Sequence, residues 1–243
     1  MFDRMFGPIS ALVFDFDGTL VDTMGNVKIG IQRGIEHASG IQVEDEALYK
    51  TFGAAPQDVF RRWVAPDQVA AAMDFWLAFE AGLTSADIRP FPEVEEMLAY
   101  FHNQKFPMAI FTGRDRASTL RIMVAHGWLG KYFTEEKMVC GDDGIPTKPA
   151  PDALLKLSKV LGIELPRILM IGDHTHDVRA GQAAGSKTAA ALWDLPPGQG
   201  TDRSRFREGW VRWDGVDVDV RLTSPMNLVN WLSHDEQAKK SET

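Results

Sequence analysis

Two carboxylates two residues apart, Asp15 and Asp17, follow a short apolar run in the segment Asp15-Phe-Asp-Gly-Thr-Leu-Val-Asp22. On an extended chain this spacing points both side chains in broadly the same direction. A buried strand does not tolerate ionised carboxylates without partners, so the pair needs a cation or a role in chemistry. A structural reading, in which Asp17 caps a turn, explains one acid but not both. Gly18 permits a tight exit from the strand.

A second acidic pair, Asp173 and Asp177, lies in the segment Gly172-Asp-His-Thr-His-Asp-Val178 after another apolar run. At a spacing of four, these acids fall on one side of a helix that begins here. The two pairs together predict a site for a hard cation such as Mg²⁺, which prefers oxygen ligands. His174 and His176 raise a zinc alternative, which the surrounding acids and the distant position of the single cysteine disfavour.

Two further polar clusters are weaker signals when each is taken alone. The segment Thr112-Gly-Arg-Asp115 ends an apolar run and opens a helical pattern, so it offers a hydroxyl and backbone N–H groups to an anion. Lys148 lies in Pro146-Thr-Lys-Pro-Ala-Pro-Asp152, where prolines fix the backbone around one lysine just before a helix. Many strand–helix turns resemble the first segment, and isolated lysines are usually at the surface.

The four clusters together predict a phosphoryl-transfer site. A carboxylate that attacks a phosphate dianion must overcome repulsion of roughly 4 kcal/mol per unit pair, at about 4 Å and an effective dielectric of about 20. A divalent cation and Lys148 would supply compensating charge, while Thr112 and backbone amides would hold the equatorial oxygens. Asp17 is suited to protonate the leaving oxygen and then to deprotonate water.

Apolar runs that end in polar residues predict the strands that position these clusters. The runs are Ala11–Phe16, Phe106–Thr112, Arg167–Gly172 and, more weakly, Lys187–Leu192 and Val216–Leu222. Helical patterns over 92–104, 115–126, 151–161 and 177–184 alternate with them. This alternation predicts an α/β fold with a Rossmann-like parallel sheet flanked by helices. Ligands bind beyond the carboxyl ends of strands in such sheets, so we expect the clusters to converge.

One stretch breaks the alternation. From about Thr23 to Asp87 the sequence contains helical segments but no convincing strand, and Phe75, Trp76 and Phe79 fall at helical spacing as the core of a small bundle. We therefore predict an α/β core of residues 1–21 and 90–243, with an all-helical cap of residues 22–89 inserted after the first strand. The segment 195–212 is predicted to be a solvated loop.

Composition limits the class of protein. A formal net charge of −8 disfavours broad binding of nucleic acid, which is itself a polyanion. The single cysteine, Cys140, excludes an internal disulfide and is predicted to be a small buried hydrophobe at a strand end. No window approaches the roughly 20 apolar residues that cross a bilayer, and no signal peptide is evident, so we expect a cytoplasmic protein without membrane partners.

The motifs Asp15-x-Asp-Gly-Thr, Thr112, Lys148-Pro and Gly172-Asp173-x-x-x-Asp177, in this order and at these strand ends, resemble those of the haloacid dehalogenase-like hydrolase superfamily. The resemblance extends from about Ile9 to Leu232. Taken together the motifs are highly specific, although each alone is not. The helical insertion after the first motif resembles the mobile cap of the phosphoglycolate phosphatase-like branch.

The resemblance implies a role for each matching residue. Asp15 would be the nucleophile that forms an aspartyl-phosphate, and Asp17 the general acid and base. Thr112 and the backbone amide of Gly113 would bind the phosphoryl group, and Lys148 would neutralise charge between it and Asp15. The Mg²⁺ ligands would be Asp15, the Asp17 carbonyl and Asp173, with Asp177 supporting or joining them.

Two positions depart from the family pattern. Many relatives carry Asn after the threonine, whereas this chain has Gly113-Arg114. Arg114 is therefore a candidate substrate-binding residue, with a surface position as the alternative. His174 occupies a position where small hydroxyl residues or Asn are common.

The predicted function is a Mg²⁺-dependent phosphatase that acts on a small phosphorylated metabolite. Asp17 argues against the dehalogenase branch, which is not built around an acid/base aspartate. The alternatives are a phosphomutase resembling β-phosphoglucomutase and, in a different class, a non-catalytic binding protein that keeps the fold. The substrate stays open, although Lys28, Arg33, Arg61 and Arg62 are candidates to meet a carboxylate or second phosphate. The sequence does not determine the oligomeric state.

Overall fold

The structure is a computed structural model that describes residues 9–49, 51, 56–84, 86–193 and 216–240. The segment 195–212, predicted to be a solvated loop, lies outside these residues. Within the described part of the chain, no helix has both the length and the apolar character needed to span a membrane.

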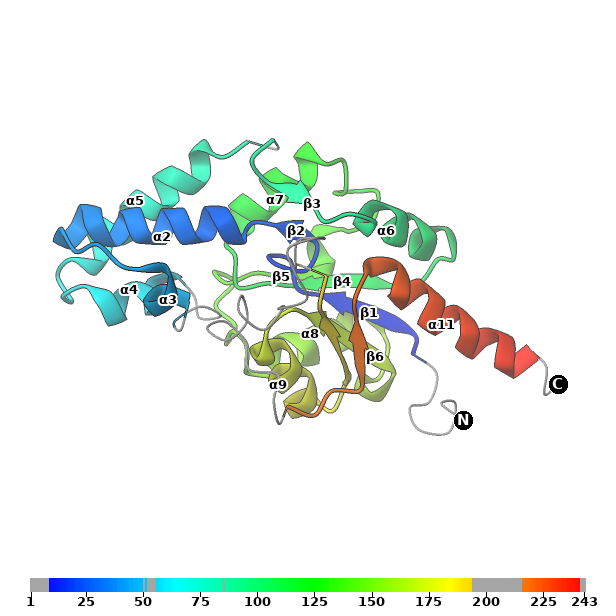
Figure 1. The fold of residues 1–243 in the computed structure, drawn as a ribbon. Helices are drawn as coiled ribbons and strands as arrows, with labels where there is room; N and C mark the ends of the chain where they lie inside the picture. The colour runs from blue at the N-terminus through cyan, green and yellow to red at the C-terminus, as the bar shows by residue number, and fades with distance from the viewer. Residues whose placement is uncertain (1–8, 50, 52–55, 85, 194–215, 241–243) are drawn as a thin grey trace.

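A six-stranded sheet forms the centre of the fold (Figure 1). Its order is β5 (Met138–Val139), β4 (Met108–Phe111), β1 (Ala11–Phe14), β6 (Ile168–Gly172), β7 (Lys187–Ala191) and β8 (Val220–Leu222). Every neighbouring pair of strands is parallel, which confirms the predicted sheet. The five predicted runs each contain a strand. The additional strand, β5, is only two residues long, and Cys140 follows it as a buried residue at the strand end.

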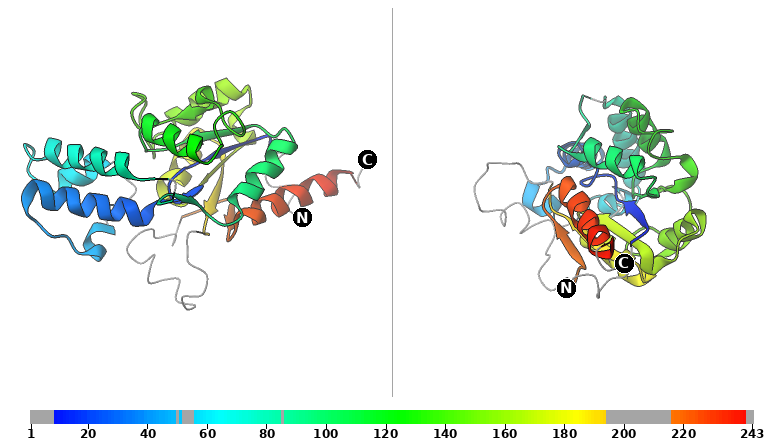
Figure 2. Two further views of the ribbon diagram at one scale, coloured as in Figure 1. Left: turned by 90° about the horizontal axis from the view of Figure 1, so that it is seen from above. Right: turned by 90° about the vertical axis from the view of Figure 1, so that its right-hand side faces the viewer.

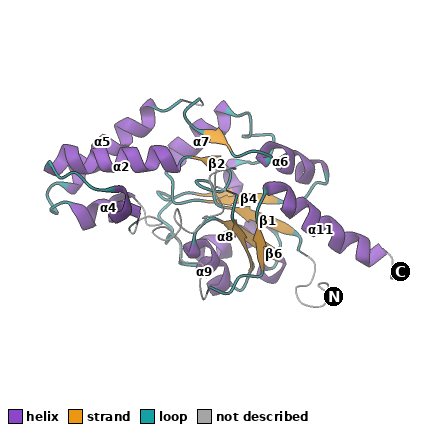
Figure 3. Cartoon of the chain, viewed as in Figure 1, coloured by secondary structure: helices purple, strands orange, loops and turns teal. Residues whose placement is uncertain are grey.

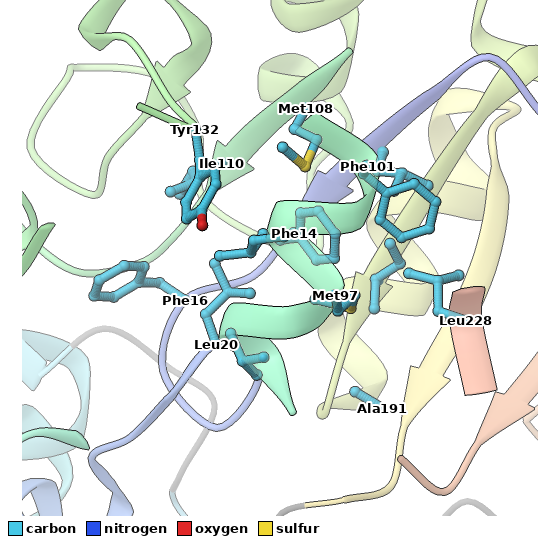
Figure 4. Close-up of a cluster of buried hydrophobic side chains, with 14 of the residues drawn as sticks. Phe14, Phe16, Leu20, Met97, Phe101, Met108, Ile110, Tyr132, Ala191 and Leu228 are labelled. Carbon is cyan, nitrogen blue, oxygen red and sulfur yellow. The ribbon is translucent and has the colours of Figure 1, made fainter. Parts of the chain in front are cut away.

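Helices cover both faces of the sheet (Figure 3). Side chains alternate along β1, so Leu12 and Phe14 enter one apolar core while Ala11 and Val13 enter the other. The first core, part of which is drawn in Figure 4, lies under α6 (Val94–Asn103), α7 (Arg116–Ala125) and α11 (Pro225–Lys240). The second lies under α8 (Asp152–Leu161) and α9 (Thr175–Ala184). Two 3-10 turns, Glu135–Lys137 and Leu165–Arg167, precede β5 and β6.

A helical insertion separates β1 from the rest of the sheet. It leaves through β2 (Val21–Asp22) and returns through β3 (Arg89–Pro90), which pair with each other as antiparallel strands. Between them lie α2 (Met24–Ser39), α3 (Asp45–Tyr49), α4 (Pro56–Trp63) and α5 (Val69–Gly82). The helices α2 and α5 run side by side and extend away from the sheet (Figures 1 and 2). We refer to α2–α5 as the helical insertion.

The helical insertion has an apolar core of its own. Ile31 and Ile35 of α2 pack there with Phe60 of α4 and Trp76 of α5. Of the three aromatic residues predicted to form this core, Trp76 is buried, while Phe75 and Phe79 are half-buried. The insertion therefore holds together through its own side chains and not only through contacts with the sheet.

Replacing Gly30 of α2 with Ala is expected to reduce the free energy of unfolding by about 1–3 kcal/mol. A Cβ at this position would lie 2.6 Å from Cζ3 of Trp76 and 2.7 Å from Cδ1 of Phe79, so α2 and α5 would have to move apart. Urea unfolding curves measure the effect. Gly25→Ala is the matched control, because it lies in the same helix with nothing within 4 Å of the added Cβ. The control should be neutral or slightly stabilising, since Ala favours helix over Gly. Equal losses in both variants would contradict the close approach.

Candidate active site

The predicted site residues gather at the carboxyl end of the sheet. Asp15 follows β1, Thr112 follows β4 and Asp173 follows β6, and these three strands are adjacent in the sheet. Lys148 lies in the connection between β5 and α8. A pocket of about 440 Å³ separates these residues from the helical insertion. Its lining includes all eight predicted residues, Asp15, Asp17, Thr112, Gly113, Arg114, Lys148, Asp173 and Asp177.

Lys148 is at the centre of the charged floor of this pocket. Its Nζ lies 2.7 Å from Oδ1 of Asp15 and 2.7 Å from Oδ1 of Asp177. It also lies over the Phe111 ring, 5.0 Å from the centroid. Burial alone would lower the pKa of Lys148, but the two carboxylates outweigh burial and raise it. The lysine is therefore a permanent positive charge between two acids.

Asp15 is held tightly by its neighbours. Its Oδ1 accepts the backbone N–H of Phe16 at 2.6 Å in addition to the contact with Lys148. Burial raises the pKa of Asp15 from 3.8 to about 7, and Asp177 adds to the rise, while Lys148 opposes it. Burial therefore disfavours the ionised form of Asp15, and a bound cation would stabilise that form.

Three acids form a group that fits such a cation. One carboxylate oxygen from each of Asp15, Asp173 and Asp177 lies within 4.8 Å of the others. Two of these acids lie in close contact with glycines. A Cβ at Gly18 would lie 2.4 Å from Oδ2 of Asp173, and a Cβ at Gly172 would lie 2.2 Å from Oδ2 of Asp177. Gly18 also has φ +75°, which favours glycine. Three converging carboxylates suit a hard divalent cation.

The N-terminus of α9 explains the two histidines. His174 is the N-cap residue, and its Nδ1 accepts the backbone N–H of His176 at 3.1 Å. The Asp177 side chain completes the capping box by accepting the backbone N–H of His174 at 2.9 Å. Burial lowers the pKa of His174 to about 4, so the ring is neutral. Among the described residues, the acid group that could hold a metal contains no histidine, which weakens the zinc alternative.

Asp17 has different partners from Asp15. Its carboxylate accepts the Thr23 hydroxyl at 2.5 Å and is contacted by the Arg114 guanidinium, with Nη2 2.8 Å from Oδ1 and Nε 3.0 Å from Oδ2. The side chain of Asp17 is not part of the three-acid group. The two acids of the first motif therefore lie in separate electrostatic environments, which is the arrangement that separates roles between paired acids.

Arg114 is a buried residue, so the surface position left open for it is wrong. The side chain is only 4% exposed and also contacts Glu80 of α5 and the Ser118 hydroxyl, the latter at 2.7 Å. Sequence reasoning missed Glu80. The available signal was an acid, one of two with Asp74, in the otherwise apolar stretch Val69–Gly82. Burial raises the pKa of Glu80, and the guanidinium opposes that rise. Arg114 thus links the helical insertion to Asp17.

Comparison with known proteins identifies the family of the chain. Residues 12–191 match the family model described as haloacid dehalogenase-like hydrolase. A phosphoglycolate phosphatase from Aquifex aeolicus is 25% identical over 227 residues, which cover 92% of this chain and 96% of that protein. Pyrophosphatase PpaX from Bacillus pumilus is 29% identical over 188 residues, or 77% of this chain and 85% of its own.

Solved structures show the same fold. The crystal structure of a putative phosphoglycolate phosphatase from Lactobacillus plantarum superimposes with a TM-score of 0.74 at 19% identity, and the match covers 92% of this chain and 99% of that one. The family match spans well over half of the sequence and includes the strands that carry the site. The chain therefore belongs to the haloacid dehalogenase-like hydrolase family, as its motifs predicted, and it is an enzyme of the phosphatase type.

Proposed function

We propose that this protein is a Mg²⁺-dependent phosphatase that hydrolyses a small phosphate monoester through a phosphoryl group carried on Asp15. The observation that carries the proposal is the pair of acids at the pocket floor with separate partners. Asp15 contacts Lys148 and belongs to the three-acid group, whereas Asp17 is held by Arg114. Such an arrangement supports a nucleophile beside a cation site and a proton carrier next to it.

In the first half-reaction, Asp15 attacks the phosphorus atom. Because Oδ1 is engaged by Lys148 and the Phe16 N–H, we assign the attack to Oδ2. As the bond from Oδ2 to phosphorus forms, the bond from phosphorus to the ester oxygen breaks, and Asp17 gives a proton to that oxygen. The alcohol then leaves, and the phosphoryl group stays on Asp15.

In the second half-reaction, Asp17 takes a proton from water, and the water oxygen attacks phosphorus. The bond to Asp15 breaks, which releases phosphate and restores both side chains. Thr112 is suited to hold an equatorial oxygen, because its Oγ1 already accepts the Arg114 backbone N–H at 3.1 Å and its own proton is free to be donated. We assign the backbone amide of Gly113 the same role.

The proposed Mg²⁺ ligands are Asp15, Asp173 and Asp177, with the Asp17 carbonyl as a fourth. When bound, Mg²⁺ supplies positive charge that offsets repulsion between the Asp15 carboxylate and the phosphate dianion. Lys148 contributes to the same balance from the protein side.

We also propose that the helical insertion, with its flanking residues 22–89, acts as a cap over a core of residues 1–21 and 90–243. The pocket lies between the two, and Glu80 of the insertion contacts Arg114 of the core. Closure would exclude water from the phosphoryl group on Asp15 until the alcohol has left.

Phosphate release from a panel of phosphate monoesters tests the function. We expect release that requires Mg²⁺, is abolished by EDTA and is lost in Asp15→Asn. Acid-quenched enzyme should carry one phosphoryl group on the peptide that contains Asp15. Transfer of that group to a second hydroxyl of a sugar phosphate, without release of phosphate, would instead indicate a phosphomutase. Absence of both reactions in folded, Mg²⁺-loaded protein would overturn the proposal.

A further inference from the structure

The wall of the pocket that faces the catalytic acids is apolar. It is formed by the helical insertion, chiefly by Val27, Ile31, Val59, Met73, Trp76 and Leu77. Among the described residues that the insertion contributes to the lining, the only polar side chains are Gln57 and Glu80. In a phosphatase of this layout, the part of the substrate beyond the phosphate would contact this wall. The wall favours a carbon skeleton over a densely charged group.

The cations of the pocket are already matched by acids. Among the described lining residues, the lysines and arginines are Lys148 and Arg114. Lys148 contacts two carboxylates, and Arg114 contacts those of Asp17 and Glu80. A second anionic group on the substrate would therefore meet more negative than positive charge.

The basic residues of the helical insertion do not change this balance. Lys28 pairs with Asp45, and Arg61 pairs with Asp58. The four basic residues that the sequence offered as ligands for a second anion, Lys28, Arg33, Arg61 and Arg62, are all absent from the described lining of the pocket. The helical insertion thus brings an acid to this pocket and, among its described residues, no lysine or arginine.

Glu80 carries an unused acceptor. Its side chain is 3% exposed. Its Oε2 contacts Arg114 and accepts the Ser118 hydroxyl at 3.2 Å. Its Oε1 is buried and has no hydrogen-bond partner among the described residues. Buried acceptors are almost always satisfied, and the Glu80 side chain lines the pocket, so the missing donor is one that a ligand could bring.

We propose that the alcohol released by this enzyme has an apolar skeleton, bears a hydroxyl or amino group that donates to Oε1 of Glu80, and carries no second anionic group. The inference rests on the proposed phosphatase function and names its substrate class. The proposed substrate class excludes phosphoglycolate and pyrophosphate, the compounds in the names of the similar proteins, because each of these compounds has a further anionic group.

Two-carbon phosphate esters that differ only at the far end test the proposal. They are ethyl phosphate, 2-hydroxyethyl phosphate, 2-aminoethyl phosphate and phosphoglycolate, with benzyl phosphate added to probe the apolar wall. We expect kcat/KM for the hydroxyl and amino esters to exceed that for phosphoglycolate at least about tenfold, and benzyl phosphate to exceed ethyl phosphate. Phosphoglycolate or pyrophosphate as the best substrate would overturn this inference while leaving the phosphatase function intact. No release from any ester would instead count against the function.

Removal of the acceptor gives a second readout. In Glu80→Met, the preference for 2-hydroxyethyl phosphate over ethyl phosphate should fall to about one. Glu80 also supports Arg114, so an overall loss of activity is expected, and the ratio of the two substrates is the measurement that matters. An equal fall for both esters would show that Glu80 acts only through Arg114, and would overturn its assignment to the substrate.

A surface variant tests the charge balance without disturbing the core. Leu77 lines the pocket and is 48% exposed, so Leu77→Arg should fold and add a cation at the apolar wall. We expect it to raise kcat/KM for phosphoglycolate relative to ethyl phosphate by about tenfold. Leu155→Arg adds the same charge to α8, outside the pocket, and should leave the ratio unchanged. An unchanged ratio in both variants would overturn the claim that missing positive charge excludes anionic substrates.

Discussion

Replacing Asp15 with Asn is expected to lower kcat/KM for phosphate release by on the order of 10⁴-fold or more. The amide has nearly the shape of the carboxylate but is a very poor nucleophile toward phosphorus, so the first half-reaction has no substitute. The fold should persist, because Lys148 keeps its 2.7 Å contact with Asp177. Steady-state phosphate release, with circular dichroism as the check on folding, measures the effect.

The control for this substitution is another Asp→Asn change at a nearby exposed position. Asp22 lies in β2, is exposed and does not line the pocket, so Asp22→Asn should change kcat/KM by no more than about threefold. If Asp15→Asn retained more than about 1% of the wild-type rate, Asp15 would not be the nucleophile. A covalent phosphoryl group on the variant would lead to the same conclusion.

Replacing Lys148 with Met is expected to reduce the free energy of unfolding of the metal-free protein by about 3–5 kcal/mol. Met fills much of the same volume but leaves Asp15 and Asp177 buried without the cation between them. Urea unfolding in EDTA measures the loss, and catalysis should fall strongly as well. Lys131→Met removes a lysine whose ion pair with Glu95 is exposed and screened by solvent, so its urea unfolding curve should nearly coincide with that of the wild type.

The loss in Lys148→Met should depend on pH in a defined direction. The pKa of Asp15 is raised from 3.8 to about 7 mainly by burial, so its ionisation destabilises the folded state as pH rises through this window. Lys148 lowers the pKa of Asp15, so its removal should raise the pKa of Asp15 in the folded state still further. The deficit of the variant should therefore be greatest above pH 7 and shrink toward pH 5. Added Mg²⁺ should restore part of the stability at pH 8. A small or pH-independent deficit would contradict the bridging role.

The central strands were predictable because both faces of the sheet are covered. Burial on both sides makes each of β1, β4 and β6 a nearly continuous apolar run, which the sequence displays directly. The strands β2, β3 and β5 are two residues long, and no periodicity can be read from two residues. They form because neighbouring backbone comes within hydrogen-bonding reach.

The charged floor of the pocket was predictable for a related reason. Parallel strands end at the same edge of the sheet, so polar residues after Phe14, Phe111 and Gly172 had to converge there. The contact between Arg114 and Glu80 was not predictable, because it depends on how α5 lies against the core. No local pattern fixes that packing. Glu80 is one of two acids in an otherwise apolar helix, and the sequence does not indicate a partner for it.

The order of strands in the sheet has a consequence for how the chain acquires its fold. The strand β1, the first along the described part of the chain, lies in the middle of the sheet, where Val13 pairs with Ala109 on one side and Met170 on the other. While the ribosome produces the intervening segments, the helical insertion can fold around its own apolar core. During this time the apolar strand Ala11–Phe14 has no hydrogen-bonded neighbour on either edge. Nascent chains that stop before Ile168 leave one edge of β1 without its neighbour, and such edges pair readily with other chains. This topology therefore requires that β1 be protected from pairing with other chains until β4 and β6 have been synthesised.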